Sequence, residues 1–142
     1  MKILDKIISC SYADGAFTSA NLTTIRNSND SNGYLGVSIT DNTNAGPVPS
    51  VALAADGAEL YGAVIAVNET TQRASIATTG IIPFKLNAAT GATNITDVQG
   101  VLGAGAGVTK PGTAGKGLGR IVSRSGTDQV VWVDLDRAPI AP

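Results

Sequence analysis

Residues 119–135 have the sequence GRIVSRSGTDQVVWVDL, which predicts two antiparallel strands joined by a short turn. In the second half of this stretch Val131, Val133 and Leu135 share one face of an extended chain, because side chains alternate with a period of two along a strand. Residues 125–128 favour the turn, since Gly and Asp tolerate the positive φ angles that tight turns require. A β-hairpin is therefore expected near the end of the chain.

Short strand-like segments of the same kind recur through the sequence. Further strands are expected at residues 34–40, 62–67, 74–77 and 81–86, with polar turn segments at residues 68–71 and 87–91. In the first of these segments Leu35, Val37 and Ile39 share one face. Few stretches extend for ten residues without Gly, Pro or clustered β-branched residues, so the helix signals are weak. Short strands separated by such turns predict an all-β fold, a small β-sandwich or a β-barrel-like domain.

The first 50 residues differ in composition from the rest of the chain. They are rich in Asn, Ser and Thr, and they end in GPVP at residues 46–49, a typical boundary sequence. We therefore expect residues 1–50 to form an extended N-terminal arm or subdomain and residues 51–142 to form a β-rich core domain. The Gly/Ala-rich residues 100–119 suit a long loop that lies against another surface, and a mobile hairpin is an equally open interpretation.

The charged residues are few, and their two signs are segregated. Ten Lys and Arg oppose eleven Asp and Glu, for a formal net charge of −1. This balance disfavours nucleic acid and anionic membrane surfaces as partners, because both require clustered cations. Residues 27–72 contain only acidic charges, whereas residues 98–127 contain only basic ones.

Two hypotheses explain this segregation. The opposite charges could pair within one chain, or they could pair head-to-tail between identical subunits, a contact that closes into a ring when the rotation allows it. The candidate inter-subunit residues are Lys110, Lys116, Arg120 and Arg124 on the basic side and Asp56 and Glu59 on the acidic side.

The sequence lacks the residues on which much catalytic and metal chemistry depends. It has no His and a single Cys, Cys10, which excludes Ser-His-Asp and Cys-His catalysis, zinc sites built from His and Cys, and an intrachain disulfide. Asp134 and Asp136 have the spacing of a paired-carboxylate site, and residues 41–44 carry oxygen ligands that suit calcium. Solvated strand ends and Asn-rich turns explain both patterns more simply. We therefore expect a protein that is not an enzyme and that uses no cofactor or metal.

Two apolar features suggest contacts with other proteins. Ile3, Leu4, Ile7 and Ile8 cluster near the N-terminus and could anchor an arm by burial in a partner. Trp132 is either a core anchor of the final strand or a binding hot spot at an interface. No apolar run approaches the roughly 18 residues of a membrane-spanning helix, so no membrane partner is expected.

Several short motifs between Ala55 and Leu135 resemble a known family. They are GAV at residues 62–64, ASIATTG at residues 74–80 before Ile81, the Gly/Ala-rich segment with KPG at residues 110–112, and GLGRIV at residues 117–122 before the last strand. In these features the chain resembles the small, β-rich capsid cement (decoration) proteins of tailed bacteriophages. The resemblance covers roughly the last 60% of the chain and does not extend to the first 50 residues.

This resemblance implies a homotrimer that is assembled in the host cytoplasm and binds the major capsid protein on the outer surface of an icosahedral virion. Such a protein would clamp junctions between capsid subunits against the pressure of packaged DNA. Ile3, Leu4, Ile7 and Ile8 would then be the capsid contacts. Two alternatives remain: a carbohydrate-binding or host-adhesion module of a virion, which exposed aromatic residues at loop tips would favour, and another structural virion or filament subunit.

Overall fold

The computed structural model describes residues 3–4, 7–41, 49–87, 100–112, 116–125 and 129–139. These residues form β1 (Ile3–Leu4), β2 (Ile7–Ser11), α1 (Ser19–Arg26), β3 (Gly36–Asp41), β4 (Ser50–Leu53), β5 (Gly62–Asn68), β6 (Arg73–Ala77), β7 (Gly80–Lys85), β8 (Val101–Gly105), β9 (Val108–Pro111), β10 (Arg120–Ser125) and β11 (Val130–Asp134). The all-β class predicted from the sequence is confirmed, and it includes a closed barrel.

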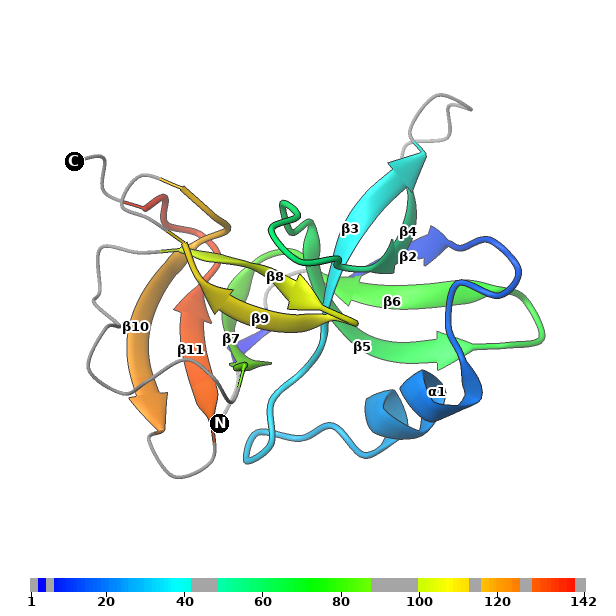
Figure 1. Ribbon diagram of the computed structural model, residues 1–142, viewed down its shortest axis with the longest axis horizontal. Coiled ribbons are helices and arrows are strands. Elements are labelled where there is room, and N and C mark those ends of the chain that lie inside the picture. The colour runs from blue at the N-terminus through cyan, green and yellow to red at the C-terminus, as the bar shows by residue number, and fades with distance from the viewer. Residues whose placement is uncertain are drawn as a thin grey trace.

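Five strands close the barrel in the order β2-β4-β3-β5-β6 (Figure 1). The strand pairs are antiparallel except β2 and β4, which run parallel with Ser11 opposite Ser50 as their register pair. The hydroxyl oxygens of these two serines lie 2.8 Å apart and form a hydrogen bond across that seam. Small and β-branched side chains fill the interior, among them the fully buried Val37, Val64 and Ile76.

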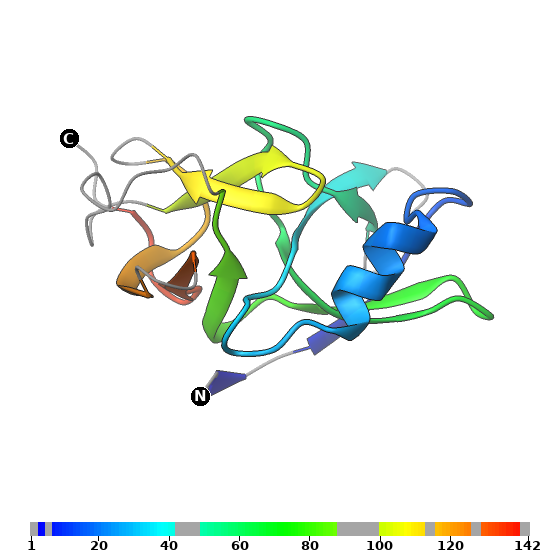
Figure 2. The same cartoon turned by 60° about the horizontal axis from the view of Figure 1, so that its bottom comes forward.

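Helix α1 packs on β5 at the outside of the barrel (Figure 2). Leu22 and Ile25 lie three residues apart on one face of the helix and join the buried residues of the barrel. A capping box starts the helix: Thr18 Oγ1 accepts a hydrogen bond from the Asn21 backbone N–H, and Asn21 Oδ1 accepts one from the Thr18 N–H. The sequence carries only a weak signal for this helix, because eight residues supply too few apolar positions to show a helical period.

A second sheet has the order β1-β7-β11-β10. The predicted final hairpin is confirmed as the antiparallel pair of β10 and β11, and Val131 and Val133 lie in the core. Val122 has no residue opposite it in β11, which makes a β-bulge in β10. The core under this sheet comprises the buried residues Tyr34, Ala54, Leu60, Ala63, Ala77, Ile82, Phe84, Leu86, Val101, Ile121, Val131 and Val133.

The hairpin of β8 and β9 lies over the junction between the barrel and the four-stranded sheet (Figures 1 and 2). The Gly36 N–H donates a hydrogen bond to the Gly107 carbonyl at 2.7 Å, and the Gly107 N–H donates one to the Ala54 carbonyl at 3.1 Å. The Gly103 N–H likewise donates to the Ala58 carbonyl at 2.9 Å. Residues 101–111 of the Gly-rich segment thus form a hairpin that packs against its own chain, which agrees with the hairpin interpretation in place of the long loop.

The expected domain boundary at residue 50 needs correcting. It falls inside β4, between Ser50 and Val51, and both of these residues pair with β3 in one barrel. Strand β2 also pairs along its length with β6. Residues 7–41 therefore complete the barrel instead of forming an arm, because β4, β5 and β6 cannot close it without them.

Substitution of Gly103 by Ala tests the hairpin contact. A Cβ atom there would collide with the carbonyl oxygen of Ala55 and lie 2.8 Å from the Cβ of Ala54, so backbone must move. We expect the free energy of unfolding in urea to fall by about 1–3 kcal/mol. Ala106→Gly at the exposed tip of the same hairpin is the control, because its φ of +50° suits glycine. Equal stability of Gly103→Ala and the wild type would refute the contact.

Candidate functional site

The four N-terminal apolar residues expected to anchor an arm lie in two different sheets. Ile3 and Leu4 form β1, which pairs with the start of β7, whereas Ile7 and Ile8 belong to β2 of the barrel. Alternation along β2 leaves Ile7 49% exposed, while Ile8 packs against the barrel core. Of the two β2 isoleucines, Ile7 is therefore the one that offers apolar surface to a partner.

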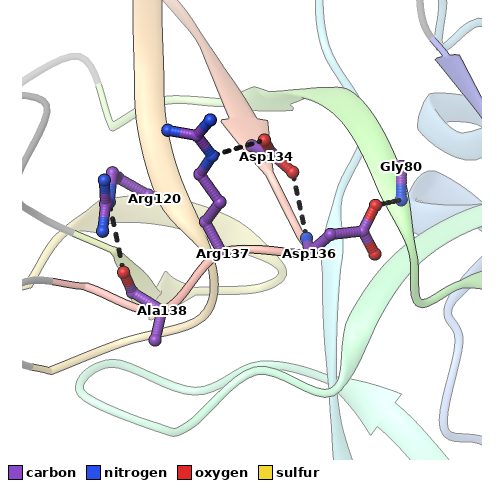
Figure 3. Close-up of polar contacts among 6 residues, drawn as sticks. All are labelled: Gly80, Arg120, Asp134, Asp136, Arg137 and Ala138. Atoms are coloured by element: carbon purple, nitrogen blue, oxygen red, sulfur yellow. Dashed lines mark hydrogen bonds and ion pairs between the residues drawn. The ribbon is translucent and has the colours of Figure 1, made fainter.

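Two of the candidate inter-subunit charges bind each other within the chain. Lys110 Nζ lies 2.6 Å from Asp56 Oδ1, and this ion pair connects β9 to the segment that follows β4. The side chain of Arg120 is also engaged, since its Nε donates a hydrogen bond to the Ala138 carbonyl at 3.2 Å (Figure 3). For these residues the structure supports the hypothesis of pairing within one chain.

The other three candidates are not paired in this way. Glu59, Lys116 and Arg124 form no ion pair with another described residue. Arg124 Nε is buried and has no hydrogen-bond acceptor among the described residues. Glu59 and Lys116 are exposed. Glu59 lies beside β3, whereas Lys116 and Arg124 lie before and within β10, so the opposite charges are on separate elements.

A hollow of about 290 Å³ adjoins β3, and Glu59 is part of its rim. We call it the β3 hollow, and it is lined by Ser38, Ile39, Ala58, Glu59, Leu60 and Tyr61. Ser38 Oγ donates a hydrogen bond to the Glu59 carbonyl at 2.6 Å, and the Tyr61 N–H donates one to the Val37 carbonyl at 2.7 Å. These bonds hold the lining segment against β3.

Ile39 in this hollow departs from the sequence-based expectation. The alternation in residues 34–40 predicts that Ile39 shares the face of Leu35 and Val37, which are buried. Ile39 is nevertheless 44% exposed. It lies near the end of β3, where the β3–β4 register shifts between Ile39 and Asp41, although its register partner Val51 is fully buried. The period of two could not predict this exposure, because it depends on the neighbours that β3 has at its end.

A second hollow of about 300 Å³ lies between α1 and β5, and no pattern in the sequence indicates it. Its apolar lining includes Leu22, Ile25 and Val67. Arg26 Nη2 and Glu69 Oε2 lie 3.6 Å apart at its rim, and both side chains are more than 60% exposed. An exposed pair of this kind contributes little to stability.

Asp134 and Asp136 are both occupied by structural hydrogen bonds (Figure 3). Asp136 Oδ2 accepts a hydrogen bond from the Gly80 N–H at 3.2 Å, and Asp134 Oδ1 accepts one from the Asp136 N–H at 3.0 Å. Asp134 Oδ2 also lies 3.4 Å from Arg137 Nε. The two carboxylates therefore fix the turn after β11 to the start of β7, a structural role that differs from that of a catalytic pair.

Trp132 is half-buried and belongs to neither core cluster. It pairs with Pro83 of β7 and Ser123 of β10, on the opposite face of β11 from Val131 and Val133. The interpretation of Trp132 as a core anchor is therefore wrong. Side chains alternate between the two faces of a strand, and the residues on either side of Trp132 point into the core, so Trp132 lies on the other face.

The described residues contain no group of three or more His, Cys, Asp or Glu side chains that could hold a metal ion. Asp41 ends β3, and the remaining residues of the imagined calcium site, 42–44, lie outside the described ranges. No helix in the described ranges has the length and apolar character of a membrane span.

Burial raises the pKa of three side chains of the barrel unit. The pKa of the Cys10 thiol lies above its ordinary value of 9.0 because the group is desolvated, an effect that the nearby Arg73 partly opposes. Desolvation is also the main cause that raises the pKa of Tyr12 and Tyr61 above 10.0. Cys10 is fully buried in the barrel, so it is a structural residue and not an accessible nucleophile.

Replacement of Asp136 by Ala should weaken the turn after β11. Loss of the bond to the Gly80 N–H is expected to lower the free energy of unfolding by about 0.5–1.5 kcal/mol. Arg137→Ala, which removes only an exposed partner of Asp134, should change it by less than about 0.5 kcal/mol. Urea unfolding compares the two, and an equal loss in both would contradict the assigned role of Asp136.

Alkaline pH should destabilise the fold through Cys10. Its thiol has a higher pKa in the folded state than in the unfolded state, so the unfolded state loses its proton first. The resulting stability is complete below the unfolded pKa of about 9 and is lost as pH rises through the folded pKa. The free energy of unfolding in urea should fall less between about pH 8 and pH 10 for Cys10→Ala than for the wild type. Equal decreases in the two proteins would refute the contribution assigned to the Cys10 thiol.

A scan against protein-family models gives no match, and a search of curated proteins finds no significant relative.

Proposed function

We propose that the chain is a structural virion protein that binds the outer surface of an icosahedral phage capsid and stabilises it. Its partners are the major capsid protein and further copies of itself, as a homotrimer. The protein performs no catalysis in this role and needs no cofactor.

The observation that carries this proposal is the resemblance of residues 55–135 to capsid cement proteins, taken together with the strands that these residues form. The motif at residues 62–64 begins β5, and the motif at residues 74–80 forms β6 and leads into β7. The Gly/Ala-rich segment forms the β8–β9 hairpin, and residues 117–122 lead into β10. All of the resembling motifs are thus parts of the β-scaffold, and none of them forms a catalytic constellation.

The mechanism is stabilisation by mass action. A protein that binds the assembled shell but not free capsid subunits lowers the free energy of the shell by its binding free energy, about 2.7 kcal/mol per site when its free concentration is 100 times Kd. Linked copies that engage several capsid subunits at once bind more tightly than each copy alone, because the later contacts are intramolecular.

The placement of the aromatic residues favours this function over a host-adhesion module. The six aromatic residues are Tyr12, Phe17, Tyr34, Tyr61, Phe84 and Trp132. All six lie in described ranges, three of them buried and three half-buried. Tyr12 and Phe17, which lie nearest to a loop, stack edge-to-face with ring centroids 4.7 Å apart. These residues therefore do not provide the exposed aromatic rings on which a sugar-binding surface is built.

Ile7 is the side chain that we assign to the capsid contact. Ile8, also a candidate in the sequence, packs against the barrel core, so a charge at that position would unfold the barrel and give an ambiguous result. Ile7 is 49% exposed at the start of β2, close to β1, and its replacement leaves the core intact.

Co-sedimentation with empty heads assembled from the major capsid protein of the same phage tests the proposal. We expect the wild type to bind and to raise the temperature at which the heads disassemble. Ile7→Asp should weaken binding by at least about tenfold, because a charge enters an apolar contact. Thr70→Asp, which adds the same charge at the exposed β5–β6 turn, should bind as the wild type does.

The possible outcomes distinguish a failure of the proposed function from a failure of the capsid contact assigned to Ile7. A wild-type protein that does not bind heads would refute the proposed function and leave the other virion or filament subunit as the better hypothesis. Wild-type binding that Ile7→Asp leaves unchanged would refute only the assignment of Ile7.

A further inference from the structure

We propose that the β3 hollow of one copy binds the β10 edge of a second copy in a head-to-tail contact. The contact deepens the self-association in the proposed function and rests on it. It joins two different surfaces, so each copy carries both halves and can bind one neighbour on each side.

The β3 hollow supplies an apolar depression with an acidic rim. Ile39 is 44% exposed within it, and Leu60 and Tyr61 complete its apolar lining. Glu59 is exposed at the rim and has no ion-pair partner among the described residues. The neighbouring Asp56 differs from Glu59, because Lys110 already neutralises it. The hollow therefore presents one uncompensated negative charge beside exposed apolar surface.

The β10 edge supplies the complementary projection. The bulge at Val122 leaves this side chain 44% exposed at the edge of the four-stranded sheet. Arg120 and Arg124 lie on either side of it in the sequence, and the Arg120 Nε is already bonded to Ala138. Arg124 is half-buried, and neither its buried Nε nor its charge has a partner among the described residues, so an acidic group of a second copy would supply the missing partner.

The two surfaces match in size, polarity and charge. A hollow of about 290 Å³ has room for an isopropyl group, which would cover Ile39 and Val122 together. Glu59 at the rim would meet Arg124, and such opposite charges fix the register of a contact and select the partner. Addition of a second sheet edge to edge is less suitable, because a bulge and arginines on an edge strand oppose regular strand pairing.

The surfaces cannot meet within one molecule. Strand β10 lies at the left end of the molecule in Figure 1, and β3 belongs to the barrel on the right, with the β8–β9 hairpin between them. The same separation lets one copy bind two neighbours without the two contacts overlapping.

Light scattering of charge-reversal variants over a concentration series tests this contact. The wild type should associate, and Glu59→Arg and Arg124→Glu should each raise the dissociation constant at least about tenfold through like-charge repulsion. Val122→Ser should also weaken association. Glu69→Arg is the matched control: it makes the same charge change at the exposed β5–β6 turn and should associate as the wild type does.

An equimolar mixture of Glu59→Arg and Arg124→Glu distinguishes a head-to-tail contact from general charge effects. Between unlike variants the charges at the two positions are opposite again, so unlike copies should pair in the mixture although neither variant associates alone. A closed ring of three would still join two like copies, so the expected product of the mixture is a pair of unlike copies and not a trimer. Two variants that associate like the wild type, or a mixture that stays monomeric, would overturn the contact.

The head-binding assay separates this inference from the proposed function. Monomeric wild-type protein that still binds empty heads would overturn the contact between copies and leave the function standing. Association in solution without any binding to heads would support the contact and count against the capsid function.

Discussion

The structure depends on the close approach of backbone to backbone at the glycines of the β8–β9 hairpin. Gly103 and Gly107 bring this hairpin within hydrogen-bonding distance of the segment that follows β4 and of Gly36 at the start of β3. Added Cβ atoms at either position would lie closer than 3.0 Å to neighbouring atoms. Glycine is therefore required there by space, and at Gly107 also by a φ of +82°.

This contact matters because each of the two cores is small. The barrel core is filled largely by Val, Ile and Leu and has one buried aromatic residue, Phe17, and the core under the four-stranded sheet has two, Tyr34 and Phe84. With so few aromatic side chains, each core gains less burial energy on its own than an aromatic-rich core would. Some residues of the barrel strands, or of the segments that lead into them, pack in the core of the four-stranded sheet: Leu60, Ala63 and Ala77. These residues join the barrel and the sheet into one folded unit.

The character of the outer surface also reflects the small number of large side chains in this protein. With the aromatic residues buried or half-buried, the large apolar groups exposed in the described part of the chain are the aliphatic side chains of Ile7, Ile39 and Val122. Each lies on a different strand: β2, β3 or β10. Separate, small apolar contacts of this kind suit a protein that binds several neighbours weakly and gains affinity from their number. Of the two acidic residues beside β3 and β4, Asp56 is paired with Lys110, whereas Glu59 has no ion-pair partner among the described residues.

Local order along the chain was enough to predict several features. The alternation in residues 129–135 predicts that Val131 and Val133 lie in the core, turn residues predict the hairpin before them, and the lack of His excludes the classes of chemistry that require it. Contacts in three dimensions were needed to establish that residues 7–41 close the barrel, that Lys110 pairs with Asp56, and that Ile39 is exposed at the end of β3. These features join residues that are distant along the chain, and a periodic pattern gives the face of a strand but neither its neighbour nor the point at which the packed interior ends.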